Sequence, residues 1–345
     1  MNKYFIYFFT ISILISCRKE ITLNLANASE KVVVQGSIEP GFPPYVILTR
    51  NQGYFDPIDS NTYNDLFIYE DEISKIKVFK LDKTEIIDSI DLSYEMIGDI
   101  AVFTNLDLPI DYWSTFSQEG FRYNLEFNWN ETLITSTTTI PFSNPLDSIW
   151  VEETDNIQDN KYNYDINAIL TDPDSIGNNF LVRSKRLEHW VIDTLTTNGT
   201  TRNENDNSLL LVDCGPDILV NGESFETRFP RPSGQGGFPN GSYKSSRYKT
   251  FINTNPYNKD SILLPEDVVL IKFSQVDLAA MKFWRGVVRN STAGNNPFSE
   301  PMNLSSNING GLGSWTGYGS RYYLVPIIKD TTITIEYVPT IFDIF

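Results

Sequence analysis

The chain is poor in the residues that most often carry catalysis. Its 345 residues include one histidine, His189, and two cysteines, Cys17 and Cys214. A single histidine excludes a zinc site built on paired histidines, and a Ser-His-Asp triad could use only His189. No Gly-x-Ser-x-Gly nucleophile motif occurs. We therefore expect no enzyme activity and no cofactor, while a hydrolase that works through carboxylates alone stays open as an alternative.

Positive charge is also scarce. The chain has 27 Lys and Arg against 44 Asp and Glu, which gives a formal net charge of −17 at pH 7. Nucleic-acid binding needs a basic footprint, and a protein that lies flat on anionic lipid needs one too. We therefore expect no nucleic-acid partner. An acidic surface of this kind favours solubility, cations or basic partners.

Long apolar runs are missing beyond the first residues. The run from Tyr4 to Ile15 follows Lys3 and is too short to span a bilayer, which takes about 20 residues. It ends in Leu-Ile-Ser-Cys, the pattern that lipoprotein signal peptidase reads. We expect residues 1–16 to be a lipoprotein signal peptide and 17–30 a lipidated tether. Acyl chains on Cys17 would hold the protein to a membrane without threading it through.

Acylation of Cys17 would leave Cys214 without a partner for an intramolecular disulfide. Cys214 ends an apolar run and has no electropositive neighbourhood in the local sequence. The pattern predicts a buried, unreactive thiol.

The remainder of the chain predicts a mainly β protein of two domains. Turn signals roughly every ten residues favour an N-terminal immunoglobulin/fibronectin-like antiparallel sandwich over 31–143. Its expected strands are 31–38, 45–50, 73–81, 86–92, 100–105, 123–129 and 133–140. Pro141 to Pro145 closes it. A second β-rich domain with one helix is expected over 144–345.

In that second domain, alternating and apolar runs predict strands at 146–152, 162–170, 180–186, 189–195, 209–212, 268–273, 322–328 and 331–337. Residues 196–207 are expected to form a polar loop. Helical spacing predicts a helix over 274–290, with Ser274 and Asp277 as a capping-box-like start and Trp284 in the core. The Gly-rich stretch 310–317 lacks the ending of a phosphate loop, so we interpret its glycines as permitting positive φ and close backbone approach.

Candidate contact residues lie in the loops. Exposed aromatic side chains suit contact with a sugar, a peptide or a protein, and here they are Tyr54, Phe55, Phe238 and Tyr243. Ordinary anchoring of the loops is the alternative for all four. Asp172 and Asp174 resemble the start of a calcium loop, but later ligand positions fail. A Pro-Asp turn explains the pair as well, so Ca²⁺ stays open.

Several stretches together resemble one family of Bacteroidota outer-membrane lipoproteins, catalogued as domain of unknown function 4249. The most specific are the C-terminal blocks 296–301, 306–313 and 317–318, with further matches at 32–36, 171–173, 178–180 and 217–222. The resemblance covers nearly all of the chain after Cys17. It implies a lipid-anchored protein of the outer membrane, encoded beside a TonB-dependent β-barrel receptor.

Arg18, Lys19 and Glu20 resemble the short signal that sends such lipoproteins to the cell exterior. The family brings no catalytic residues. Our hypothesis is a non-enzymatic accessory to a TonB-dependent transporter, acting in ligand capture or gating. A surface adhesin or structural protein, stabilised by cations, is the alternative.

Overall fold

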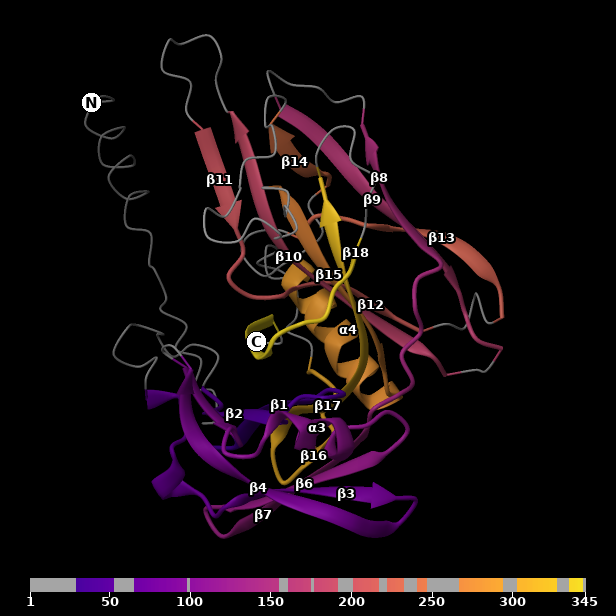
Figure 1. Ribbon diagram of the computed structural model, residues 1–345. Coiled ribbons are helices and arrows are strands. Elements are labelled where there is room, and N and C mark those ends of the chain that lie inside the picture. Colours follow the sequence, from indigo (N-terminus) through magenta and orange to yellow (C-terminus); the bar gives the residue numbers. More distant parts are fainter. Residues whose placement is uncertain are drawn as a thin grey trace, which may run out of the picture.

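The computed structural model describes residues 29–52, 65–97, 100–154, 161–174, 177–191, 201–216, 222–232, 241–246, 267–293, 303–327 and 335–343. The expected class is confirmed, since the protein is mainly β. Two β-built units are stacked on one another, and helix α4 (Leu278–Ala293) packs against the C-terminal unit (Figure 1).

The N-terminal unit contains all seven expected strands. They are β1 (Val32–Ile38), β2 (Tyr45–Arg50), β3 (Ile76–Asp82), β4 (Glu85–Ile97), β5 (Ile100–Thr104), β6 (Arg122–Trp129) and β7 (Thr132–Thr139). β4 is shared, because its first half pairs with β3 and its second half with β5. One sheet therefore holds β1, β2, β5 and the end of β4, and the other holds β3, β6, β7 and its start.

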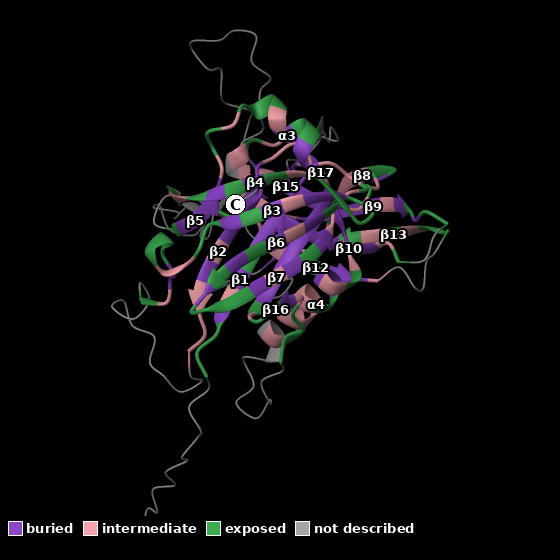
Figure 2. Ribbon diagram, turned by 90° about the horizontal axis from the view of Figure 1, so that it is seen from below, coloured by how far each residue is buried: buried purple, intermediate pink, exposed green. Residues whose placement is uncertain are grey.

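The core of this unit follows the period of two along each strand. Val32, Val34 and Ile38 of β1 point inward and pack with buried residues of the facing sheet, such as Leu125 and Phe127 of β6. The short helix α3 (Ile110–Phe116), which the sequence did not predict, contributes buried aromatic rings to the same core. Buried positions run through the strands, while much of α3 is exposed at the rim (Figure 2).

The C-terminal unit has two layers around a second core. One layer pairs β15 (Val268–Val276) with β10 (Asn179–Val191), which also pairs with β11 (Thr201–Asn205) and β12 (Leu210–Gly215). The other places β9 (Lys161–Thr171) between β8 (Ser148–Glu153) and the strands β13 (Ser224–Phe229) and β14 (Tyr243–Ser246). The predicted inward face of β9 is confirmed: Tyr164, Ile166, Ala168 and Leu170 lie in this core.

β17 (Leu312–Pro326) joins the two units. Its first part runs parallel to β1, from Leu312 opposite Val33 to Gly317 opposite Ile38. Its second part, from Tyr318, runs antiparallel to β15. β16 (Ile308–Asn309), just before it, pairs with β7, and β18 (Ile335–Glu336) pairs with its later part. Residues 308–317 therefore belong to the N-terminal unit, although the expected domain division assigned all of 144–345 to the second.

The expected Gly-rich loop is thus the start of a long strand. Its glycines do allow close approach: a Cβ added at Gly313 would lie 2.0 Å from the Val34 carbonyl oxygen, and φ there is +98°. A Cβ at Gly317 would lie 2.4 Å from the Thr139 carbonyl oxygen. The absence of side chains lets this strand run tightly against β1 and β7.

Three other expectations need correction. Residues 201–205 form strand β11 within the expected polar loop, and β10 is one strand where two were expected. The helix α4 begins at Leu278, because Ser274 is the buried continuation of β15. The Asp277 carboxylate accepts the Ala280 N–H at 2.8 Å, so Asp277 and not Ser274 caps the helix.

Candidate functional site

Part of the outer face of the N-terminal unit is turned toward the C-terminal unit. On β1 and β2, residues that alternate with the core positions point away from that core. They include Gln35, Ser37, Tyr45 and Ile47, and they form one wall of a cleft between the units. The cleft has a volume of about 550 Å³. This size falls within the range of small-molecule sites, about 300–1,000 Å³.

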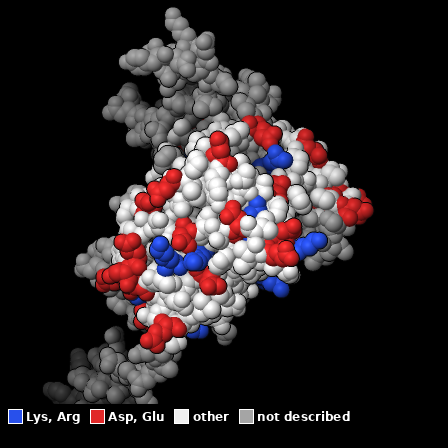
Figure 3. Space-filling model, turned by 60° about the horizontal axis from the view of Figure 1, so that its bottom comes forward, with Lys and Arg blue, Asp and Glu red and all other residues white. Residues whose placement is uncertain are grey.

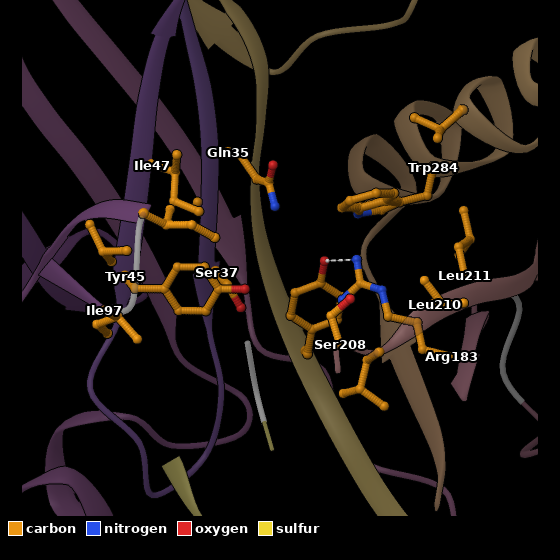
Figure 4. Close-up of a pocket in the computed structure, with 16 residues that line it drawn as sticks. Gln35, Ser37, Tyr45, Ile47, Ile97, Arg183, Ser208, Leu210, Leu211 and Trp284 are labelled. Atoms are coloured by element: carbon orange, nitrogen blue, oxygen red, sulfur yellow. Dashed lines mark hydrogen bonds between the residues drawn. The ribbon is translucent and has the colours of Figure 1, made fainter. Parts of the chain in front are cut away.

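The opposite wall comes from three elements of the C-terminal unit. β10 supplies Arg183, the start of β12 supplies Leu210 and Leu211, and α4 supplies Trp284 and Val287. α4 packs on this face of the sheet because Ala280 and Met281 are buried against Leu181 and Cys214. Trp284, expected in the core, packs against that cluster and also lines the cleft. Figure 4 shows the two walls facing each other across the space.

Tyr318 stands between the walls, at the position where β17 passes from β1 to β15. Its hydroxyl accepts a hydrogen bond of 3.1 Å from Nη2 of Arg183 (Figure 4). The Arg183 guanidinium carbon also lies 4.4 Å from the centre of the Trp284 ring. A guanidinium held against an aromatic face gains a cation–π attraction and loses freedom of rotation. Arg183 is thereby fixed in place, with 9% of its surface exposed.

A buried ion pair lies close to the Tyr318 ring. Lys272 of β15 is paired with Glu39, the residue after β1, and Lys272 Nζ is 4.7 Å from the centre of the Tyr318 ring. The Tyr322 hydroxyl donates to the same carboxylate at 2.7 Å. Both charged groups are almost fully buried. This pair connects the N-terminal and C-terminal units next to Tyr318.

Burial sets the protonation of these groups. Desolvation lowers the pKa of Lys272 to about 8, against the attraction of Glu39, so the ammonium is charged at neutral pH. Burial also raises the pKa of Tyr45 and Tyr318, which keeps both hydroxyls neutral. Burial opposes the charge of Arg183, but the Tyr318 and Tyr45 hydroxyls and Glu39 hold its pKa above the ordinary value.

A second charged cluster lies within the C-terminal unit. Glu188 of β10 is buried and bonds Arg186 at 2.9 Å and Arg231 at 2.8 Å, and Arg186 also bonds Asp206 at 2.7 Å. Each arginine has carboxylate partners, so the network is closed on itself. Such a network ties β10 to the segments around it and offers no free group for a ligand.

The sequence-predicted contact residues do not gather in this cleft. Tyr243 was expected to be exposed and is fully buried, because as the first residue of β14 it points into the second core. Burial raises its pKa accordingly. Tyr54, Phe55 and Phe238 lie outside the described residues, as do Cys17, Arg18, Lys19 and Glu20. Those predictions stay open.

Asp172 and Asp174 follow the end of β9. Asp172 is buried, with its N–H bonded to the Glu223 carbonyl at 3.1 Å, whereas Asp174 is exposed beside Gly222. In the part of the chain that the structure describes, no three His, Cys, Asp or Glu side chains are placed to hold a metal ion. Calcium binding by this pair stays a prediction.

Cys214 is buried in β12, beneath α4, as expected. Desolvation raises its pKa to about 12, so almost no thiolate forms at neutral pH. The predicted unreactive thiol is consistent with both facts. His189 lies in β10, in the strand context that the sequence indicated.

Sequence reasoning missed the cleft itself. The signal that could have revealed it is Arg183, a charged residue two positions after buried Leu181 on the same face of a strand. Tyr318 lies in the matched block 317–318, but its place at the cleft depends on the pairing of the preceding residue, Gly317, with Ile38, which are 279 positions apart. Neither wall can be assigned without that pairing.

The surface is consistent with the acidic composition. On the face seen in Figure 3, Asp and Glu are spread widely, with Lys and Arg interspersed among them. Among the described residues, no helix has the length and hydropathy needed to cross a membrane.

Comparison with known proteins assigns the chain to a family but assigns it no activity. Among curated proteins, none matches the chain. A family model matches residues 18–322, which takes in both units and every wall of the cleft. The chain belongs to the family described as Domain of unknown function (DUF4249).

Proposed function

We propose that the protein is a non-enzymatic binding protein, held by lipid on Cys17 at the exterior of the outer membrane, that captures a small ligand in the cleft between its two units. It works as an accessory to a TonB-dependent β-barrel receptor, to which it delivers the ligand or whose entrance it gates. The lipoprotein pattern at 14–17 supports the anchor, and the family resemblance supports the partner.

The cleft is the observation that carries this proposal. It is concave, its walls are largely apolar, and a few polar side chains converge on it: Gln35, Ser37, Arg183, Ser208 and Tyr318. Pockets of this composition are the usual sites for small molecules. It also lies between two units, a common place for such sites.

The chemistry of the lining favours binding over hydrolysis. Among the described residues that line the cleft, none is a His, Cys, Asp or Glu. The Tyr hydroxyls there have raised pKa values, and Arg183 stays protonated. No group at the cleft therefore changes its protonation near pH 7, which general acid–base catalysis would require.

The partner is tested by affinity purification of the full chain, tagged at its C-terminus, from outer membranes solubilised in mild detergent. We expect a β-barrel receptor to copurify in near-equal amount. The control is Cys17→Ala, which should enter the soluble fraction without the receptor because it has no site for acylation. Mass spectrometry of the mature N-terminus should find acyl chains on Cys17.

Two results would contradict the proposal. An unacylated mature N-terminus would show that the protein has no lipid anchor. Recovery of the lipid-anchored protein without any β-barrel protein would show that it has no receptor partner.

A further inference from the structure

Arg183 differs from every other buried cation that the structure describes. Five basic side chains are buried among the described residues: Lys80, Arg183, Arg186, Arg231 and Lys272. Three of them form ion pairs, with Glu188 or Glu39. Lys80 donates to two oxygens, the Thr115 carbonyl at 2.5 Å and the Gln118 side chain at 2.7 Å. Among the residues that the structure describes, the Arg183 side chain has one hydrogen bond, to the neutral hydroxyl of Tyr318.

The charge around Tyr318 is therefore unbalanced. Arg183 and Lys272 contribute two positive charges, and Glu39 contributes one negative charge that Lys272 already pairs. Two minus one leaves +1 beside the cleft. Within the described residues, no carboxylate oxygen lies within 4.0 Å of the Arg183 guanidinium. A buried charge is costly unless it is paired, so a site that keeps one has a use for it.

We propose that the cleft binds the carboxylate of a small apolar acid, with Arg183 as the group that pairs with it. This inference rests on the proposed function and names the ligand class of the same cleft.

The geometry around Arg183 fits this ligand. A guanidinium presents five N–H donors in a planar fork that matches a carboxylate, and Tyr318 occupies one edge through Nη2. Trp284 covers a face of the guanidinium, which leaves its other N–H groups to point along the plane. The net charge of +1 from Arg183, Lys272 and Glu39 matches a ligand with a single negative charge. A phosphate dianion would bring a second negative charge that nothing in the described lining neutralises.

The apolar walls fit the rest of the ligand. Ile47 and Ile97 on one side face Leu210 and Leu211 on the other (Figure 4). Each methylene of the ligand buried between them should tighten binding by roughly fourfold. The acidic surface does not prevent entry, because exposed charges are screened beyond about 8 Å at physiological ionic strength, whereas Arg183 is buried.

The test compares acids with their neutral amides by isothermal titration of the full mature protein. The probes are decanoate against decanamide, and N-acetyl-Leu-Leu with a free C-terminus against its C-terminal amide. The first pair represents alkyl carboxylates and the second represents peptide C-termini. We expect the acid of at least one pair to bind roughly tenfold or more tightly than its amide, because a hydrogen bond to a charged group is worth about that factor.

The variants are Arg183→Met, Arg183→Lys and the control Arg321→Gln. Arg321 is half-buried, is paired with Glu336, and is not among the residues that line the cleft. Arg183→Met should abolish the preference for the acid, Arg183→Lys should keep part of it, and Arg321→Gln should keep all of it. Arg183→Met should fold at least as well as the wild type, because it removes an unpaired buried charge. Its thermal midpoint checks this.

Equal binding of acid and amide would overturn the carboxylate assignment while leaving the cleft as a binding site. A preference for acids that survives in Arg183→Met would overturn the role of Arg183. Failure of all four probes to bind would overturn the ligand class, whereas the receptor proposal depends on the copurification described above.

Discussion

Glu39 and Lys272 bind each other in a place where neither meets solvent. Glu39 follows the first strand of one unit, and Lys272 lies on β15 of the other, 233 positions further along the chain. Desolvation makes each charge expensive, and the pair is stable because each compensates the other. The pair therefore specifies how the units meet more than it adds to stability.

Removing both members of this pair should cost less than the sum of the two single losses. We expect Glu39→Gln and Lys272→Met each to lower the free energy of unfolding by about 3–5 kcal/mol, since each leaves an uncompensated buried charge. The double variant should lose clearly less than the sum, because it leaves none. Urea denaturation of the full chain measures all three.

The surface pair Arg321–Glu336 provides the comparison. Glu336→Gln should change stability by about 0–1 kcal/mol, as surface ion pairs do. Additive losses at Glu39 and Lys272 would show that the two side chains do not act as a pair.

At the scale of elements, β17 depends on glycine for its place against β1. Gly313 combines a positive φ of +98° with a Cβ position 2.0 Å from the Val34 carbonyl oxygen. Gly41 also has a positive φ, +77°, but nothing lies within 4 Å of its Cβ position. Substitution at Gly41 therefore tests the cost of a positive φ alone, whereas substitution at Gly313 tests that cost together with a steric clash.

We expect Gly313→Ala to destabilise the protein by about 4 kcal/mol or more, because strand β17 must move away from β1. Gly41→Ala should cost only about 1–2 kcal/mol, the strain of a left-handed conformation alone. Urea midpoints followed by circular dichroism measure both. Similar losses for the two variants would mean that β17 accommodates the methyl group.

Elements with local patterns could be predicted from the sequence. The seven N-terminal strands and the inward face of β9 follow from apolar and polar residues that alternate within a few consecutive positions. β11 was missed because its residues, Thr-Arg-Asn-Glu-Asn, are polar throughout, and its strand state comes from pairing with β10. The start of β17 was missed because its glycines indicate turns, and only the neighbouring β1 and β7 explain them.

The candidate site was harder to predict for the same reason. Its walls come from β1, β2, β4, β5, β10, β12, α4 and β17, and no local pattern places these eight elements together. The sequence pointed to loop aromatics, whereas the cleft uses Trp284 from a helix and Tyr45 and Tyr318 from strands. Tyr243 shows the limit of the rule that aromatic residues near Gly-rich loops are exposed.

At the scale of the whole molecule, the two units share a strand and cannot separate without breaking it. Ile308 and Trp315 belong to the N-terminal core, and Tyr323 and Val325 belong to the C-terminal core. The Trp315 indole N–H bonds the Tyr123 carbonyl at 3.1 Å, deep in the first core. Because β17 contributes residues to both cores, the loss of either core removes the packing that holds one part of this shared strand.

We expect a single cooperative unfolding transition in differential scanning calorimetry, with equal calorimetric and van 't Hoff enthalpies. Gly313→Ala should shift that transition as a whole, because it weakens the shared strand. Two resolved transitions, with only one sensitive to Gly313→Ala, would show that the units unfold separately.

The parallel pairing of β1 and β17 also determines how the protein bears tension. A pull on the tether ahead of Val32, opposed by a hold near Pro326, draws the two strands along each other in opposite directions. The force then acts along the strands and is shared by all the backbone hydrogen bonds between Val33–Leu312 and Ile38–Gly317. In this shear geometry the hydrogen bonds do not break one after another from one end. A protein tied to a cell by its N-terminus would resist drag through this one ladder.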